Sequence, residues 1–506
     1  MPKKQKTWRS IWPVVVLLIL YFATRLFYLT LLPLYTDEAH HVIWAIDIVE
    51  RGDFSGALAA SRLFPVWVIS LVVPLATHDL LLGARLVSVE FGVLGLFGCY
   101  WLGHHLFDRR VGILAAILYL VVPYTFFHDR MALVDGLLTV WAIYVVLLSL
   151  MLSREPNLKY SLSLGVVLAL SSITKINGFI FFIFPLIILA IARGWSLRQW
   201  PWKSFALAYG VGLLGFVLLL ADSSTEWWQI GNRMWMEQAG PNTSLWLTWL
   251  ENGKDTLLYL GFYLSWPVFV VVCLGLGLAV GRHQRDELLL LGIAGVILGM
   301  FIFFSRIDKL DSRYLLPAVP FLLVVAARTI IGIMDKIRWQ GRQWFSYVIT
   351  LAIILPALWF DYWLVTNPSQ TPFVKADLKR YVEGKYAGYG LVETSDYLRK
   401  QLSSSPQIIV VYSEKANHTP NILKVYLYDQ RQRVIHLDVD FLREDPSWVA
   451  QRLLTATAPV FIITPDPTPG PTESKINFDT WPYIQRVAHF ERPGGSTGVN
   501  IYTKKP

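Results

Sequence analysis

Residues 134–152, VDGLLTVWAIYVVLLSLML, form an apolar run long enough to cross a hydrocarbon core about 30 Å thick. Similar runs recur from the N-terminus to about residue 365 and then stop. Of the 506 residues, 54% are hydrophobic and 16% are charged, whereas soluble domains carry roughly a quarter charged residues. The composition therefore predicts a multi-pass membrane protein with a soluble part at its C-terminus.

The basic residues predict the orientation of the spans, because basic loops tend to remain in the cytoplasm. The start of the chain, MPKKQKTWRS, is basic and precedes an apolar stretch without a small-residue cleavage site, which favours an uncleaved first helix. Every strongly basic connector falls on the inner side if the chain crosses the membrane eleven times, at about 12–34, 83–103, 111–128, 134–152, 161–175, 177–193, 204–221, 257–280, 288–304, 314–331 and 346–365.

This arrangement predicts a cell-membrane protein with a cytoplasmic N-terminus and a transmembrane domain over residues 1–366. The outer loop 35–82 is expected to contain two helices along the membrane surface, because the apolar stretch 63–77 is short and contains prolines. The other helix precedes this stretch, over about 38–50, and has an apolar face of helical spacing. A second long outer loop is expected at 222–256.

Residues 367–506 are predicted to form an extracytoplasmic α/β domain. Strand-like runs alternate there with helical patterns. The strands are expected at 408–413, 433–438 and 460–465, the helices at 392–402 and 447–455, and a hairpin around Gly494 and Gly495. The sequence of this domain contains nothing that resembles a nucleotide-binding loop.

Two compositional features exclude other classes. Lys and Arg exceed Asp and Glu by 45 to 36, and in a membrane protein such an excess reflects basic cytoplasmic loops rather than nucleic-acid binding. Cys99 and Cys273 both lie in apolar runs, so a disulfide framework is not expected.

Acidic residues at the outer ends of two spans are the first candidates for chemistry. Asp37 and Glu38 follow the first span, and an adjacent carboxylate pair there suits a general base, a metal ligand, or a solvated helix end. Asp135 opens a later span near the same predicted boundary. An acid entering a membrane segment is costly unless it faces a polar cavity, so these acids together predict a site.

Basic residues on the predicted outer side are the second set of candidates. Lys175, in SSITKING, either extends to the interface or holds a phosphate. Arg306, Lys309 and Arg313 form a basic cluster against the usual charge bias and call for an anionic partner. A lipid-linked phosphate or pyrophosphate meets that need, with Arg313 able to bind it through two hydrogen bonds.

Histidines and tryptophans near these residues are candidates with weaker support from the sequence. His40, His41 and His128 are candidates, with Glu38, to complete a metal site, although their spacing matches no known ligand pattern. Tryptophans in the loop 222–256 either stack on sugar rings or form an interfacial aromatic belt, and Asp222 and Glu226 begin that loop.

The motifs as a set resemble the dolichyl-phosphate-mannose protein mannosyltransferase superfamily, and especially its bacterial members, which include the lipid A aminoarabinose transferases. The matching stretches are TDEAHH (36–41), RMALVDGLL (130–138), SSITKING (171–178) and SRYLLPAVP (312–320). The resemblance covers about residues 1–365 and implies a C-type polytopic glycosyltransferase fold. Arg62, in ASRLFPVW, stands where bacterial members often carry Lys-Pro-Pro, and this departure leaves the donor sugar open.

The resemblance implies transfer of a sugar from a polyprenyl-phosphate donor to a protein, lipid or polysaccharide on the outer face, usually with inversion at the anomeric carbon. It assigns Asp37 as the base and Glu38 and Asp135 as supporting acids. Cationic side chains would stabilise the departing phosphate. Those assigned are Lys175, Arg313, Arg306 and Arg62, and Tyr314 and His41 are assigned to substrate binding. No cofactor is certain, and a divalent metal is left open.

Other functions compete with this interpretation. A transporter or flippase for a lipid-linked glycan would also use buried acids and an outer basic cluster, but would be expected to place them near the midplane. A third alternative is an oligosaccharyltransferase or a ligase of lipid-linked glycans. The former would be expected to show a Trp-Trp-Asp motif in its soluble domain, which residues 367–506 lack. The sequence leaves the donor sugar, the acceptor, the metal requirement and the oligomeric state undetermined.

Overall fold

The computed structural model describes residues 5–194, 196, 198, 200–220, 244–305, 310–339, 343–413, 419–439, 455–466, 478–481, 483–495 and 497–505. The chain divides into two compact units. The first comprises residues 1–29, 54–68 and 85–365, and the second comprises residues 30–53, 69–84 and 366–506.

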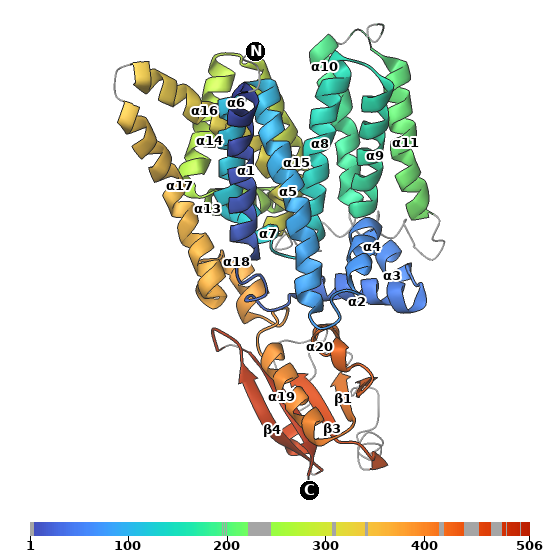
Figure 1. Cartoon of the computed structure of the whole chain (residues 1–506). Coiled ribbons are helices and arrows are strands. Elements are labelled where there is room, and N and C mark those ends of the chain that lie inside the picture. The colour runs from blue at the N-terminus through green and yellow to red at the C-terminus, as the bar shows by residue number, and fades with distance from the viewer. Residues whose placement is uncertain are drawn as a thin grey trace. The chain divides into compact units, whose positions relative to one another are not determined.

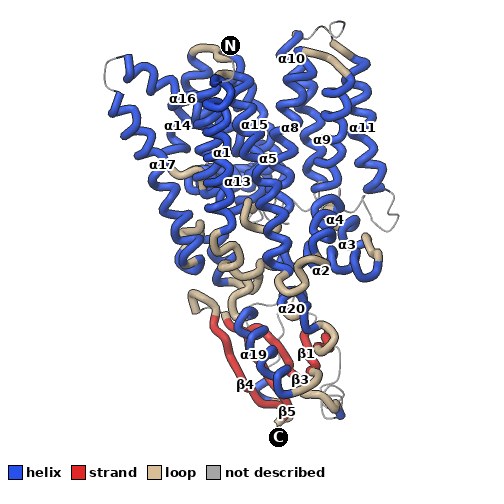
Figure 2. Tube along the Cα trace, viewed as in Figure 1, coloured by secondary structure: helices blue, strands red, loops and turns tan. Residues whose placement is uncertain are grey.

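Helices form almost all of the first unit (Figures 1 and 2). They are α1 (Gln5–Leu26), α3 (Ser55–Ala59), α4 (Leu63–Val72, which continues into the second unit), α5 (Leu80–Leu106, which begins in the second unit), α6 (Arg109–Val121), α7 (Pro123–His128), α8 (Val134–Arg154), α9 (Leu158–Thr174), η1 (Ile176–Phe182), α10 (Ile183–Arg193), α11 (Trp202–Leu220), α13 (Leu245–Tyr263), α14 (Trp266–Gly281), α15 (Arg285–Phe304), η3 (Ser312–Ala318), α16 (Val319–Trp339) and α17 (Gln343–Thr366).

Seven helical segments among the described residues are long and apolar enough to cross a membrane, or eight if one bent pair counts as a span. They are Leu80–Leu106, Val134–Arg154, Ile176–Arg193, Trp202–Leu219, Arg285–Phe304, Ser312–Ile337 and Val348–Thr366. The predicted class, a polytopic helical membrane protein with a small C-terminal sheet domain, is confirmed. The predicted number of eleven spans is not confirmed.

Two predicted spans are broken at prolines. The stretch 257–280 consists of α13 and α14, which bend by 117° at Leu264–Ser265, and Pro267 lies in the first turn of α14. Within the stretch 111–128, helix α6 ends at Val121 and a separate helix, α7, begins at Pro123. Because proline cannot donate a backbone hydrogen bond, it starts a helix far more readily than it continues one, and hydropathy alone does not register the break.

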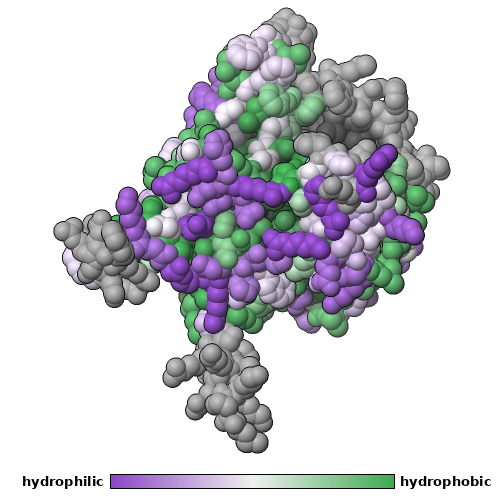
Figure 3. All heavy atoms as spheres, turned by 90° about the horizontal axis from the view of Figure 1, so that it is seen from above, coloured by the Kyte–Doolittle hydropathy of each residue, from purple (hydrophilic) through white to green (hydrophobic). Residues whose placement is uncertain are grey.

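Basic residues gather at one end of these helices. Arg110, at the start of α6, pairs with Asp335 of α16 at 2.7 Å, and Arg154, at the end of α8, lies 3.0 Å from His105. Seen from the end where the N-terminus lies, hydrophilic side chains spread across the face and hydrophobic ones flank it (Figure 3). Polar helix ends with apolar flanks fit the exit of a helix bundle from a bilayer.

A buried polar network joins α1 to the short helix α7. Asp129 accepts hydrogen bonds from the hydroxyls of Tyr21 at 3.0 Å and Tyr119 at 3.2 Å, and lies 3.7 Å from Arg25. Arg130 donates to the backbone carbonyl of Arg25 at 2.7 Å and of Tyr28 at 2.9 Å, where α1 ends. Buried charges persist only when they are paired, so this network fixes the connection that leads into α8.

A five-stranded sheet is the centre of the second unit, with strand order β2-β1-β3-β5-β4. Strands β1, β2 and β3 are parallel, whereas β5 pairs antiparallel with β3 and β4. The strands are β1 (Ile408–Ser413), β2 (Val434–Val439), β3 (Val460–Pro465), β4 (Ile484–Glu491) and β5 (Gly498–Lys504). The three predicted strands and the hairpin at Gly494 and Gly495 are confirmed, whereas the predicted helix 447–455 lies almost wholly outside the described residues.

Short helices complete the second unit. They are α2 (Thr36–Arg51), η4 (Pro368–Gln370), α18 (Lys375–Leu378), η5 (Lys379–Glu383), α19 (Leu391–Ser404), α20 (Thr419–Tyr426), η7 (Tyr428–Gln430) and η8 (Phe478–Thr480). The blue helix α2 and the orange helix α20 lie side by side (Figure 1). The helix expected at 38–50 is therefore present, and it packs on an element of the C-terminal sequence.

Replacing Asp129 by alanine is expected to destabilise the protein by about 3 to 5 kcal/mol, because buried Arg25 then loses its carboxylate. Chemical denaturation in detergent micelles measures this loss. Asp335→Ala is the matched control, since it breaks an exposed pair with Arg110 and should cost less than about 1 kcal/mol. Equal losses in the two variants would contradict the role given to the buried network.

Candidate active site

Lys175 lies at a break between two helical segments. Helix α9 ends at Thr174, Lys175 is extended (φ −163°, ψ 140°), and the 3-10 helix η1 begins at Ile176. Gly178 makes this tight break feasible, because a Cβ at that position would overlap the backbone oxygen of Ser171. The indole of Trp141 on α8 donates a hydrogen bond to the hydroxyl of Thr174 at 2.9 Å. The break is thus fixed against α8.

The ammonium of Lys175 pairs with the carboxylate of Asp135. The Nζ–Oδ1 distance is 2.7 Å, and the side chains are 12% and 2% exposed. Asp135 lies in the first turn of α8, where the helix dipole favours a negative charge. Two residues forty positions apart, each costly in a membrane alone, therefore compensate each other.

Arg313 adds a second cation to this pair. It lies in the first turn of η3, and its Nε is 3.9 Å from Oδ2 of Asp135. The guanidinium also contacts the carboxylate of Asp311 at 3.2 Å. Arg313 and Asp311 are both largely buried, at 6% exposure each. The four side chains form a compact ionic group, which is called the ionic cluster below.

Tyr314 and Arg62 extend the ionic cluster. The Nζ of Lys175 lies 4.3 Å from the centre of the Tyr314 ring, within the range of a cation–π contact. The same ring stacks on Phe301 of α15 with a centroid distance of 5.4 Å. Arg62 interacts electrostatically with both Asp135 and Lys175. The predicted residues Asp135, Lys175, Arg313 and Tyr314 are therefore in one place, with Arg62 in electrostatic range.

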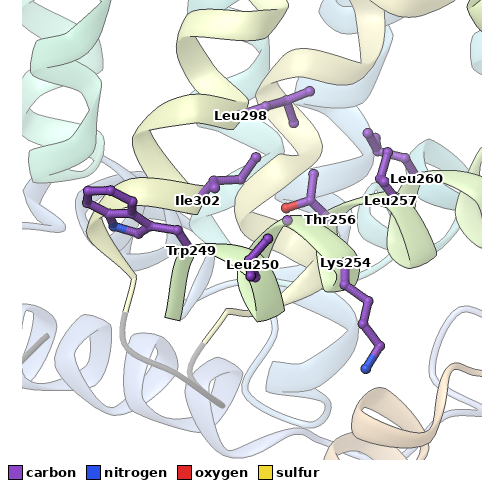
Figure 4. A pocket seen from close by; sticks show the side chains of 9 residues that line it. Trp249, Leu250, Lys254, Thr256, Leu257, Leu260, Leu298 and Ile302 are labelled. Atoms are coloured by element: carbon purple, nitrogen blue, oxygen red, sulfur yellow. The ribbon is translucent and has the colours of Figure 1, made fainter. Parts of the chain in front are cut away.

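An apolar groove lies between α13 and α15, and both helices contact η3, which carries Arg313 and Tyr314. Its volume is about 520 Å³. Figure 4 shows the side chains that line it, which are Trp249, Leu250, Lys254, Thr256, Leu257, Leu260, Leu298 and Ile302, together with Gly253. Ile302 follows Phe301, the residue that stacks on Tyr314, and the hydroxyl of Tyr259 on α13 donates to the carbonyl of Leu310 at 3.3 Å.

The other predicted acids and histidines lie on α2 in the second unit. Asp37 is half-buried in its first turn, and Glu38 and His41 are buried. The backbone N–H of Tyr35 donates to Oε2 of Glu38 at 3.0 Å, so Glu38 fixes the start of the helix. His40 is half-buried on the same helix. The two adjacent acids therefore differ, because Glu38 is buried and caps the helix whereas Asp37 is half-buried.

His128 ends α7 and is 1% exposed, between the rings of Tyr124 and Phe127. Neither of its ring nitrogens has a hydrogen-bond partner in the described part of the chain. Within the same described residues, no three His, Cys, Asp or Glu side chains gather in a way that could hold a metal ion. Glu38, His40 and His128 thus do not form a metal site of three ligands there.

Several predicted residues lie outside the described part. They include Arg306 and Lys309, and most of the outer loop 222–256 with Asp222, Glu226, Trp227, Trp228 and Trp235. Asp311, which contacts Arg313, was not predicted as a site residue. Its signal was its position two residues before Arg313 in the basic motif. The groove on α13 was also not predicted, because apolar lining residues look like any lipid-facing helix.

Comparison with known proteins supports the predicted resemblance. Residues 62–221 match the family model described as dolichyl-phosphate-mannose-protein mannosyltransferase. None of the curated proteins matches the chain. The match falls on the part of the chain that contains Arg62, Asp135 and Lys175.

The fold is similar to that of two solved structures. The crystal structure of ArnT from Cupriavidus metallidurans bound to undecaprenyl phosphate matches with a TM-score of 0.57 and 16% identity, over 98% of each chain. The oligosaccharyltransferase from Archaeoglobus fulgidus in the apo form matches with a TM-score of 0.50 and 14% identity, over 90% of this chain and 70% of that chain. The resemblance to the mannosyltransferase superfamily and the predicted fold class are confirmed.

A double-mutant cycle tests the pairing of Lys175 with Asp135. Lys175→Met should destabilise the protein by about 3 kcal/mol, because it leaves a buried carboxylate short of one cation. Adding Asp135→Asn to Lys175→Met should recover most of that loss, which gives a coupling of at least about 1 kcal/mol in detergent denaturation. Lys254→Met, which removes an exposed pair with Glu251, is the control. Strict additivity would show that the two side chains act independently.

Proposed function

We propose that this protein is a glycosyltransferase that moves a sugar from a polyprenyl-phosphate-linked donor to an acceptor on the extracytoplasmic face of the membrane. The observation that carries the proposal is the ionic cluster of Asp135, Lys175, Arg313 and Asp311 beside an apolar groove. An amphiphile with an anionic head and a long apolar chain matches both features.

The charge of the site supports binding of a phosphate. Lys175, Arg313 and Arg62 supply three positive charges, and Asp135 and Asp311 supply two negative charges, which leaves an excess of one positive charge. A phosphate in this position competes with Asp135 for Lys175 and with Asp311 for Arg313. The guanidinium is suited to two parallel hydrogen bonds, and the ammonium acts as a point charge.

The groove on α13 and α15 supports binding of the isoprenoid chain. Its lining is apolar apart from the hydroxyl of Thr256 and the ammonium of Lys254 (Figure 4). Helices α13 and α15 both contact η3, and Phe301 of α15 stacks on Tyr314, whose ring centre lies 4.3 Å from Nζ of Lys175. ArnT, whose fold is similar, was crystallised with undecaprenyl phosphate. Transport of a lipid-linked glycan has no comparable observation in its favour.

The reaction requires a base for the acceptor. In the proposed mechanism the carboxylate of Asp37 takes the proton of the acceptor hydroxyl, whose oxygen attacks the anomeric carbon. The bond from that carbon to the phosphate oxygen breaks with inversion, and the phosphate keeps the electron pair. Lys175 and Arg313 stabilise the charge that develops on the phosphate. Glu38 caps α2 and supports Asp37 indirectly.

The positions of charges along α8 support the proposed orientation. This helix has Asp135 in its first turn and Arg154 in its last, and its 21 residues span about 30 Å. Arg154 lies beside His105 in the basic group that is expected in the cytoplasm. The ionic cluster, at the start of α8, then faces the extracytoplasmic side.

The experiment is transfer of radiolabelled sugar from a panel of synthetic polyprenyl-phosphate sugars in membranes. Asp37→Asn should reduce the turnover rate by about 100-fold or more, because the amide cannot accept the proton. Asp47→Asn is the matched control on the same helix, where Asp47 pairs with Arg51 at 3.1 Å.

Either of two results overturns the proposal. If the parent protein neither transfers nor hydrolyses any donor of the panel at matched expression, the protein is not such a transferase. If Asp37→Asn transfers as fast as the parent, the assignment of the base is wrong.

A further inference from the structure

The start of α2, which carries Asp37, is held by residues of the C-terminal part of the chain. The backbone N–H of Leu34 donates to the hydroxyl oxygen of Tyr426 at 2.7 Å. The backbone N–H and the hydroxyl of Thr36 both donate to the carbonyl of Tyr386, at 3.1 and 2.9 Å. These three hydrogen bonds bracket the residues immediately before Asp37.

The donor residues of these hydrogen bonds are buried, whereas Tyr386, whose carbonyl accepts two of them, is exposed. Leu34 is 0% exposed and Thr36 is 1% exposed. The ring of Tyr35 packs on that of Tyr381, with 4.8 Å between centroids. A buried backbone N–H that loses its acceptor is destabilising, so the segment has a strong preference for this arrangement.

A close backbone approach adds a steric constraint. A Cβ atom on residue 388 would lie 2.5 Å from the backbone oxygen of Leu34 and 2.9 Å from Cβ of Pro33. Only glycine fits there, because both neighbours belong to backbone or to a rigid ring. Gly388 therefore brings the loop of Tyr386 into contact with the segment before Asp37.

The far end of α2 is held as well. The hydroxyl of Tyr428 donates to Oε1 of Glu50 at 2.9 Å, and Nε of Arg431 lies 3.2 Å from the same oxygen. Helix α2 is thus fixed at both ends to the C-terminal sequence. The last turn of α2 and its first turn cannot shift independently of the sheet domain.

We propose that the C-terminal domain is the positioning element for the catalytic base, with Tyr426, Tyr386 and Gly388 setting the position of Asp37. This inference rests on the proposed function, in which Asp37 deprotonates the acceptor. A displacement of about 1 Å in such a group lowers a rate by up to about 100-fold. The domain then controls the rate of transfer, whereas binding of the donor phosphate depends on side chains of the first unit.

The test separates turnover from donor binding in the full-length protein. Tyr426→Phe removes the acceptor of the Leu34 N–H and keeps the ring. It should lower the rate of transfer at saturating donor by about tenfold or more, with no change in the affinity for undecaprenyl phosphate in lipid nanodiscs. Tyr412→Phe is the matched control, because Tyr412 bonds to His436 within the same domain and has no contact with α2 in the described contacts.

A second pair of variants guards against a simple folding defect. Thr36→Val keeps the shape of the side chain and removes one hydrogen bond to Tyr386, and Gly388→Ala introduces the overlap with Leu34. Both should lower the rate of transfer while the affinity for undecaprenyl phosphate is kept.

Three outcomes are decisive. Transfer rates equal to the parent in Tyr426→Phe and Thr36→Val overturn the positioning role and leave the proposed function intact. If these variants lose both their affinity for undecaprenyl phosphate and their thermal stability, the positioning role is also overturned, since the contacts would then be only structural. A parent protein that binds undecaprenyl phosphate but transfers no sugar defeats the proposed function and, with it, this inference.

Discussion

A carboxylate and an ammonium at the edge of a bilayer can persist only together, and the ion pair between Asp135 and Lys175 meets that constraint. It joins the first turn of α8 to the break after α9, at 2.7 Å and with little exposure. Arg313 and Asp311 from η3 complete the neutralisation. In the proposed function, a donor phosphate therefore displaces Asp135 from Lys175 and Asp311 from Arg313, which limits its affinity and favours its release after transfer.

The two units divide the chemical roles. Side chains of the first unit supply cations, an aromatic ring and an apolar groove, all of which suit a lipid-linked phosphate. The second unit supplies the acid on α2, which is fixed to the sheet domain through Tyr426 and Tyr386. If the protein acts as proposed, this division gives the C-terminal domain a function that needs no nucleotide-binding loop, which is to position the carboxylate of Asp37.

Hydropathy and charge bias were sufficient to predict the class of fold. They were not sufficient for the breaks at Pro123 and Pro267, because an averaged apolar run hides a local loss of hydrogen bonding. The individual motifs identified Asp135, Lys175 and Arg313, but only the fold shows that Lys175 pairs with an acid forty residues earlier. The attachment of α2 to residues nearly four hundred positions later has no local signal, since a tyrosine hydroxyl and a glycine in a loop are common.

The most direct measurement of the central claim is an electron cryomicroscopy structure of the protein in lipid nanodiscs with undecaprenyl phosphate. We expect phosphate oxygens at about 3 Å from Nζ of Lys175 and from the guanidinium of Arg313, with the isoprenoid chain along α13 and α15. The contact between Lys175 and Asp135 should lengthen as the phosphate takes its place. A phosphate bound elsewhere, with the Asp135–Lys175 pair unchanged, would contradict the assignment of the ionic cluster as the donor site.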